Sequence, residues 1–200
     1  LKGFEELAKA GLTTEQILTG NMAFFEGGTD RGFGTYQFTR RNGDRVWGFT
    51  LSDGVVTHDA AFQSVDERRA QADFGPRGVE YNFVDSHHFN LAAYTIAGLV
   101  GLGGMMPVTV HRDWNGRPGT LTWWIDNAIE ERTRRKEKRE APNRILWAHQ
   151  MYKMRAFAVL VGDTDRNLGN VLITPDWRLW MIDFTRAFRT QTDIRYPNDL

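Results

Sequence analysis

The spacing of apolar residues divides the chain into a strand-rich first part and a helix-rich second part. After a segment with helical spacing over residues 3–19, aromatic and β-branched residues among glycines predict antiparallel strands over 33–39 and 45–51. The Asn-Gly dipeptide between them is a strong signal for a two-residue hairpin turn. A further strand is expected over 58–65, and a polar loop is expected to follow it through Gly78.

A helix and two more strands are expected in the middle of the chain. Residues 87–101 carry apolar side chains at helical spacing, with Ser86 as the expected N-cap and a glycine at the end. The runs "MMPVTVHR" (105–112) and "GTLTWWID" (119–126) have the composition of strands. This order of elements is typical of an α+β protein.

The remainder of the chain reads as helices followed by a small hairpin. Residues 126–140 are highly charged and predict a solvated helix, which ends at Pro142. A long amphipathic helix follows, and its apolar stripe is expected to face the core: Trp147, Met151, Met154, Ala158 and Val161. We therefore predict an α+β fold with two lobes, one with an N-terminal helical segment and an antiparallel sheet over residues 1–125, and a mainly helical one over residues 126–200.

Composition and charge exclude several classes of function. The 200 residues are 41% hydrophobic, which is ordinary for a folded protein. Lys plus Arg and Asp plus Glu number 25 each, so the balance of charge gives no general reason to expect binding to nucleic acid. Cysteine is absent, which excludes disulfides, thiolate zinc sites and a cysteine nucleophile, and fits a reducing compartment such as the cytoplasm.

No apolar run approaches the length of about 18–20 residues that a transmembrane helix needs, so no transmembrane segment is expected. The first residues alternate charged and apolar positions, unlike a signal peptide. The chain begins with Leu1 instead of Met and stops at "YPNDL", which fits a processed product or an excerpt of a longer protein.

The last hairpin carries the main chemical signal of the sequence. Two β-prone runs, "NVLI" and "RLWMIDF", flank "TPDW", in which Pro175 and Asp176 suit the two central positions of a type I turn. Counting outward from this turn places Asn170 and Asp183 together at the open end, because paired strands lie only ~4.8 Å apart. An amide and a carboxylate oxygen at one point are ligands that suit Mg²⁺ or Mn²⁺, with phosphate and water completing the shell.

Asp165 precedes Asn170 by five residues in the polar loop "DTDRNLGN". A carboxylate beside a metal-bound phosphate could accept the proton of an attacking hydroxyl group. Each of these residues alone is more often a cap or a turn former. Their order, a loop Asp, an Asn five residues later, a hairpin and then an Asp, matches the catalytic and metal loops of kinases.

These motifs resemble those of the protein-kinase-like superfamily, in particular its divergent branches, the phosphatidylinositol 3- and 4-kinase catalytic domains and the HipA-like bacterial kinases. The catalytic-loop and metal-loop counterparts are "TDRNLGN" and "IDFT". Upstream, "NLAAY", "MMPVTV" and "GTLTWWID" are similar to a helix, a Val-Pro strand and a turn into the hinge strand. The resemblance covers residues 55–190 and is strongest over 161–188. It implies a two-lobed kinase-like fold, with residues 1–125 as the small lobe and residues 126–200 as the hinge and the start of a truncated large lobe with the catalytic and metal loops.

The resemblance implies a role for each matching position. Asp165 would be the catalytic Asp, Arg166 matches the loop Arg, and Asn170 and Asp183 would bind the metal. The hinge backbone near the adenine would be Trp124, Ile125 and Asp126. Including the position of the phosphate-pairing Lys, the residues assigned to ATP and its metal are Gln63, Trp124, Ile125, Asp126, Asn170 and Asp183.

Four positions depart from the family pattern. Gln63 stands in place of the phosphate-pairing Lys, and Asn90 stands in place of its Glu partner. Because both are neutral, they could bond each other in the same space without leaving an unpaired charge. Asn167 replaces the His of the catalytic loop, and Thr185 replaces the Gly of Asp-Phe-Gly. The glycines of 27–34 either cover a phosphate or serve hairpin turns, and the pattern does not distinguish the two.

The sequence thus predicts a kinase-like phosphotransferase that uses ATP and Mg²⁺ or Mn²⁺ and transfers the γ-phosphate to a hydroxyl group on a protein, a lipid or a small molecule. One alternative is a pseudokinase, a nucleotide-binding or regulatory module without turnover, because loss of a preorganised charge costs on the order of 10²–10³ in rate. Another is transfer of AMP by a nucleotide bound in a different orientation. The acceptor is not specified by the sequence.

Overall fold

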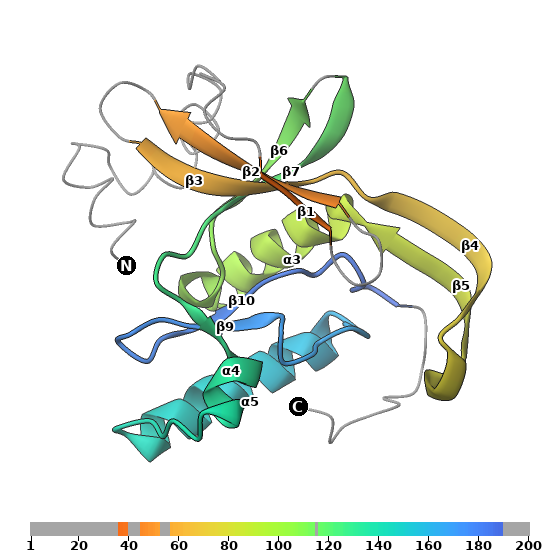
Figure 1. The fold of residues 1–200 in the computed structure, drawn as a ribbon. Helices are drawn as coiled ribbons and strands as arrows, with labels where there is room; N and C mark the ends of the chain where they lie inside the picture. Colours follow the sequence, from red (N-terminus) through yellow and green to blue (C-terminus); the bar gives the residue numbers. More distant parts are fainter. Residues whose placement is uncertain (1–35, 40–44, 53–56, 115, 190–200) are drawn as a thin grey trace. The chain divides into compact units, whose positions relative to one another are not determined.

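The computed structural model describes residues 36–39, 45–52, 57–114 and 116–189. They form two compact units between which the chain passes three times (Figure 1). The first unit includes the segments up to Gln63 and Val108–Trp124, and the second includes Ser64–Pro107 and the part from Ile125 onward. No helix among these residues is long and apolar enough to cross a membrane.

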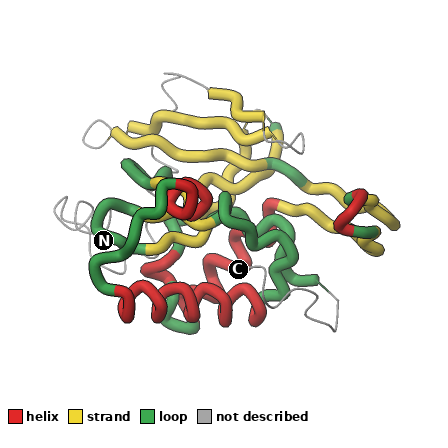
Figure 2. Tube along the Cα trace, turned by 60° about the horizontal axis from the view of Figure 1, so that its bottom comes forward, coloured by secondary structure: helices red, strands yellow, loops and turns green. Residues whose placement is uncertain are grey.

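The first unit is a five-stranded antiparallel sheet, seen as adjacent strands in Figure 2. Its order is β1-β2-β3-β7-β6, so the last two strands add to the edge formed by β3. The strands are β1 (Tyr36–Thr39), β2 (Arg45–Ser52), β3 (Thr57–Gln63), β6 (Thr109–Trp114) and β7 (Arg117–Trp123).

The two faces of this sheet differ because side chains alternate along each strand. One face buries an apolar cluster of Ala60, Phe62, Val110 and Leu121. The other face is polar: Gln63 lies opposite Thr120, and the hydroxyl groups of Thr109 and Thr122 are 3.2 Å apart. Gln63, the expected counterpart of the phosphate-pairing Lys, therefore belongs to the polar face.

The second unit combines helices with two small antiparallel sheets, β4-β5 and β10-β9-β8. Its strands are β4 (Asp66–Asp73), β5 (Val79–Ser86), β8 (Ile129–Glu130), β9 (Val171–Ile173) and β10 (Leu179–Met181). Its helices are η1 (Gly75–Arg77), α3 (His87–Leu99), η2 (Gly103–Met105), α4 (Glu131–Lys136) and α5 (Arg144–Leu160).

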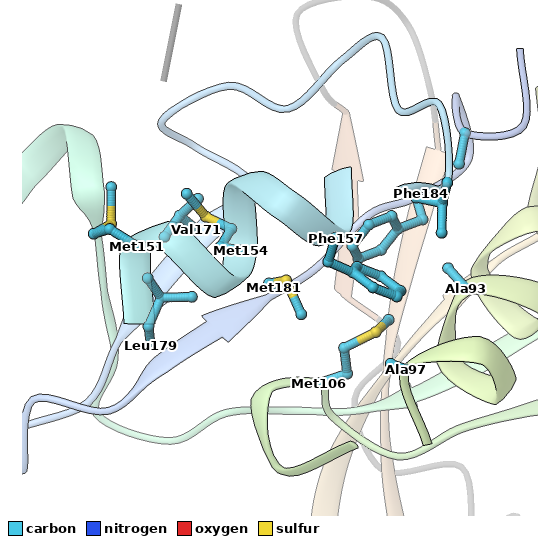
Figure 3. Packing of buried hydrophobic residues seen from close by; sticks show 12 residues of the cluster. Ala93, Ala97, Met106, Met151, Met154, Phe157, Val171, Leu179, Met181 and Phe184 are labelled. Atoms are coloured by element: carbon cyan, nitrogen blue, oxygen red, sulfur yellow. The ribbon is translucent and has the colours of Figure 1, made fainter. Parts of the chain in front are cut away.

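One hydrophobic core holds the second unit together (Figure 3). Helix α5 contributes Met154 and Phe157, the hairpin β9–β10 contributes Leu179 and Met181, and α3 contributes small alanines. Burial of an apolar side chain of this size contributes about 1.5–3 kcal/mol to the stability of the folded state. Packing within this cluster is therefore the main interaction that holds the hairpin against the helices. The long amphipathic helix and its apolar stripe are thus confirmed.

Most expected elements are confirmed. The fold is α+β with antiparallel sheets, and the strands predicted over 33–39, 45–51 and 58–65 correspond to β1, β2 and β3. The helix over 87–101 is present as α3, although the Ser86 side chain makes no capping hydrogen bond. The segments 3–19 and 27–34 lie outside the described residues. The division into kinase-like lobes at residues 125 and 126 stays a prediction.

The polar loop expected up to Gly78 was a wrong prediction. Residues 66–73 instead form β4, in which every residue except Ala70 pairs with β5. Most of its side chains are exposed and only Ala72 is buried. The strand therefore lacks the alternation of apolar and polar residues by which half-buried strands are identified, and backbone pairing with β5 defines it instead.

The charged segment 126–140 is also less solvated than expected. Its helical part is short, and the Glu131 side chain is 0% exposed and paired with Arg134 and Arg135. Burial alone would raise the pKa of Glu131, but the hydrogen bonds from these two arginines outweigh it, so its pKa lies below the usual value. This buried acid anchors α4.

Gly119 in β7 generates a prediction about the first unit. A Cβ at this position would lie 2.4 Å from the Phe62 ring and 2.6 Å from the Gln63 carbonyl oxygen. Gly119→Ala should therefore lower the free energy of unfolding by about 1–3 kcal/mol, measured by urea denaturation. Gly98→Ala is the matched control, because nothing lies within 4 Å of its added Cβ. Equal stability of the two variants would contradict this packing.

Candidate functional site

The loop between α5 and β9 carries the first group of predicted site residues. It leaves the helix through Gly162, whose φ of +56° favours glycine. Asp163 then bonds back to the loop, since its Oδ1 accepts a hydrogen bond from the backbone N–H of Asp165 at 3.0 Å. This turn begins the segment that contains Asp165, Arg166 and Asn170.

Arg166 is the central connection of the site. Its side chain is 2% exposed and that of Asp163 is 0% exposed, with 2.6 Å between the Arg166 Nη2 and the Asp163 Oδ2 atoms. The Nη1 group donates to the backbone oxygens of Asn170 and Ile182, both at 2.7 Å, and Nη2 donates to that of Asp183 at 3.2 Å. One guanidinium therefore joins the loop before β9 to the end of the hairpin.

The guanidinium of Arg166 also packs against an aromatic ring. Its Cζ atom is 4.0 Å from the centroid of the buried Phe184 ring, a cation-π distance. Phe184 in turn contacts Phe157 of α5 in an edge-to-face arrangement at 5.5 Å, and both rings are labelled in Figure 3. Arg166 is thus held by charge, hydrogen bonds and packing together.

The backbone of Asp165 is fixed by two asparagines. Its carbonyl oxygen accepts hydrogen bonds from the Nδ2 group of Asn167 at 3.1 Å and from that of Asn170 at 3.0 Å. The Oδ1 atom of Asn167 accepts from the N–H of Gly169. Asn167, which stands where the phosphoinositide-kinase motif has His, therefore shapes the loop by side-chain contacts with its backbone.

The hairpin brings Asn170 and Asp183 to the same end, as predicted. The register pairs Met181 with Val171, and the N–H of Ile182 donates to the Asn170 carbonyl oxygen at 3.1 Å. Asp183 is the next residue along the chain. The turn at Pro175 and Asp176 is confirmed by the hydrogen bond from the N–H of Trp177 to the oxygen of Thr174.

Helix α5 holds this hairpin at its closed end. The side-chain amide of Gln150 donates to the oxygen of Trp177 at 2.9 Å and accepts from the N–H of Leu179 at 2.8 Å. Both groups of one amide are therefore satisfied by the turn of the hairpin. The hairpin is anchored by Gln150 at one end and by Arg166 at the other.

Asp183 has a left-handed backbone conformation, with φ of 59°, which residues other than glycine rarely adopt. Such strain persists only where neighbouring contacts determine the conformation. The following residues supply them: the N–H of Phe184 donates to the buried Asn90 Oδ1 at 2.6 Å, and the oxygen of Thr185 accepts from the N–H of Ser86 at 2.9 Å. The Thr185 hydroxyl donates to the Asp183 Oδ1 at 3.1 Å.

The segment after this turn has a second ionic anchor. Arg186 and Arg189 both pair with Glu80 of β5. Arg189 has its pKa lowered by burial, which outweighs the opposing effect of Glu80 and other nearby acids. Together with the pairing of Thr185 and Ser86, these contacts tie the chain after Asp183 to strand β5.

The remaining predicted site residues lie next to two crossings of the chain between the units, Gln63 at the first crossing and residues 124–126 at the last. Gln63 and Trp124 belong to the first unit, whereas Ile125 and Asp126 belong to the second. The N–H of Trp124 donates to the carbonyl oxygen of Asp59 at 3.0 Å, so this group completes the sheet. The adenine of a nucleotide bound at the predicted hinge would therefore need backbone groups other than this N–H as hydrogen-bond partners.

The donor set suits a hard cation only if a ligand contributes further oxygens. No group of three His, Cys, Asp or Glu side chains among the described residues could hold a metal ion. Asn170 and Asp183 offer one amide and one carboxylate, and the Asn170 amide nitrogen already donates to Asp165. The amide oxygen is left as the ligand atom, which fits Mg²⁺ held mainly by phosphate and water.

One residue of the site, and one contact of another residue, were not predicted from the sequence. Asp163 is the buried partner of Arg166, and its only sequence signal is the spacing of three residues. Asn90 was recognised as the replacement for a Glu, but its hydrogen bond to the N–H of Phe184 joins residues 94 positions apart. No local pattern predicts such a contact.

No protein-family model matches this chain, and no curated protein is significantly similar to it. The comparison with kinases therefore rests on the motifs and on the contacts described above.

The Asp163–Arg166 pair predicts a clear stability difference. Arg166→Met should lower the free energy of unfolding by about 3–5 kcal/mol, because it leaves the Asp163 carboxylate buried without a cationic partner. Urea denaturation measures this loss. In the double variant Asp163→Asn/Arg166→Met, part of the stability should return, since the unpaired charge is gone. Additive losses in the double variant would show that the two side chains do not depend on each other.

Proposed function

We propose that this protein is a kinase-like phosphotransferase that uses ATP and Mg²⁺ and transfers the γ-phosphate to a hydroxyl group of a protein, a lipid or a small molecule. The observation that supports the proposal best is the network around Arg166, which binds the backbone of both Asn170 and Asp183. It places the loop that contains Asp165 beside the two proposed metal ligands. The absence of cysteine fits a reducing compartment, so the proposal locates the protein in the cytoplasm.

Asn170 and Asp183 are the residues that would hold the metal, Mg²⁺ or Mn²⁺. When bound, the metal would neutralise charge on the transferred phosphoryl group. The Thr185 hydroxyl group bonds one oxygen of Asp183 and restricts the rotation of this carboxylate. The chain therefore supplies one carboxylate whose orientation is set before any ligand arrives.

Asp165 is the proposed general base. Its carboxylate would accept the proton of the acceptor hydroxyl group as the oxygen attacks the γ-phosphorus and ADP leaves. Three hydrogen bonds to its backbone carbonyl oxygen, from Asn167 N–H, Asn167 Nδ2 and Asn170 Nδ2, hold the Asp165 backbone in place. Arg166 was expected among the catalytic residues, but its contacts favour a positioning role, since its guanidinium is engaged by Asp163 and by three backbone oxygens.

A pseudokinase is the second candidate function. It is favoured by the replacement of the Lys–Glu pair with Gln63 and Asn90. Asn90 also has a structural task, because its Oδ1 accepts from the N–H of Phe184 in the metal loop. A neutral residue that holds the loop would serve a protein that binds nucleotide without turnover as well as an enzyme. The two candidates differ in whether phosphate is transferred.

Metal-dependent nucleotide binding tests the proposal first. Calorimetric titration of the purified chain should detect ATP binding that requires Mg²⁺. Asp183→Asn, which keeps the size and removes the charge, should weaken binding of the Mg-ATP complex at least about tenfold, because one charged ligand to the metal is lost. Asp176→Asn is the control, because this exposed turn residue lies at the opposite end of the hairpin.

Two results would argue against this site. If a well-folded chain binds no ATP, the proposal that the protein uses this nucleotide is contradicted. Equal affinity of the Asp183→Asn variant and the wild type, or equal loss in Asp176→Asn, would mean that the metal does not bind at the open end of the hairpin.

Restoring the family's ion pair distinguishes the enzyme from the pseudokinase. If Asn90 serves the metal loop, the double variant Gln63→Lys/Asn90→Glu should gain no phosphate transfer and should unfold at lower urea concentration, since the acceptor for the N–H of Phe184 is altered. Transfer is measured with radiolabelled ATP, and Gln63→Lys alone is the control. Appearance of transfer only in the double variant would favour the pseudokinase.

A further inference from the structure

Helix α5 is apolar on two opposite sides. One side packs into the core of the second unit through Met151, Met154, Phe157 and Ala158. The opposite side is solvent-exposed in the described part of the chain. We call it the outer face of α5, and it consists of Ile145, Leu146, His149, Tyr152, Lys153, Ala156, Val159 and Leu160.

The outer face exposes more apolar surface than the solvated side of a helix normally does. Ile145 is 69% exposed, Tyr152 65% and Leu160 63%. Lys153 is the one charged residue on this face. A helix that is apolar around its whole circumference is normally covered on all sides. The outer face therefore has the composition of an interface.

The spacing of the outer face is that of a helix-pairing seam. Ile145, His149, Tyr152, Ala156 and Val159 follow one another at intervals of four, three, four and three. This is the heptad pattern by which one helix packs along another. The seam is about 21 Å long at 1.5 Å per residue, which is long enough for four turns of a partner helix.

The charges beside the seam are mostly basic. Helix α5 contains Arg144, Lys153 and Arg155 and no acidic residue. The Cζ atom of Arg155 lies 6.0 Å from the centroid of the exposed Tyr152 ring. Arg134 of α4 lies over the ring of Trp147, and Arg144 pairs with Glu140 of the segment between the two helices. Complementary charge requires acidic residues in whatever covers this face.

We propose that the outer face of α5 is a docking surface for an amphipathic helix of a partner protein, with acidic residues on both sides of its apolar stripe. A second copy of the chain fits less well, because two α5 helices would bring only basic residues together. An anionic membrane fits less well too, because the seam is narrow and contains His149, whereas insertion into a bilayer needs a broad apolar face. This inference does not depend on ATP chemistry.

The test uses a designed, fluorescently labelled helical peptide with leucine at the a and d positions and glutamate at e and g. Its binding to the purified chain is followed by fluorescence anisotropy. A peptide with lysine in place of glutamate and vesicles containing phosphatidylserine are compared. We expect the glutamate peptide to bind and the lysine peptide and the vesicles to bind much more weakly.

Variants locate the binding on α5. Tyr152→Ser should weaken binding of the glutamate peptide about tenfold, because it removes a central aromatic contact. Lys153→Glu should weaken binding of the glutamate peptide and strengthen binding of the lysine peptide. Tyr81→Ser is the matched control, because Tyr81 of β5 is 67% exposed and is not part of the outer face.

Five results would overturn the proposal. The first four are equal binding of the two peptides, no binding of either, preferential binding to vesicles, and a dimer in light scattering that Tyr152→Ser disrupts. An equal effect of Tyr81→Ser and Tyr152→Ser would also overturn it, since the contact would then not be specific to α5. Both substitutions replace exposed side chains, so the folded state should survive, and circular dichroism checks this.

Discussion

The buried ion pair between Asp163 and Arg166 is the interaction on which the candidate site depends. Two charges removed from water cost several kcal/mol each unless their hydrogen-bonding groups are satisfied. Here the guanidinium donates to the Asp163 carboxylate and to three backbone oxygens, from Asn170, Ile182 and Asp183. The hydrogen bonds of this one buried arginine can therefore all form only when the loop and the end of the hairpin lie together.

This constraint also explains how a strained residue can stand at the proposed metal site. The positive φ of Asp183 is unfavourable by itself. It is maintained because Arg166 binds the oxygen of Asp183 on one side while Asn90 binds the N–H of Phe184 on the other. The conformation of the proposed metal ligand is thus determined by side chains from a loop and a helix distant in sequence, which is what a preorganised site requires.

Local features of the second unit were predictable from the sequence, and distant ones were not. The C-terminal hairpin follows from its turn residues, and the meeting of Asn170 and Asp183 follows from counting outward from Pro175. Strand β4 was missed because pairing with β5, rather than apolar alternation, defines it. The bond from Phe184 to Asn90 and the buried state of Asp163 depend on tertiary packing, which no local pattern encodes. The apolar spacing of α5 predicted the stripe that faces the core, whereas the outer face is identified only by the exposure of its side chains in the structure.

The central claim is that a divalent metal and nucleotide meet at the open end of the hairpin, and paramagnetic relaxation by Mn²⁺ tests it most directly. In NMR spectra of the isotope-labelled chain, Mn²⁺ added with ATP should broaden the side-chain amide of Asn170 and the backbone amide of Phe184 first, because broadening falls steeply with distance from the metal. The Asn143 side-chain amide at the start of α5 should broaden least. Broadening that is independent of ATP, or that is as strong at Asn143 as at Asn170, would contradict the account.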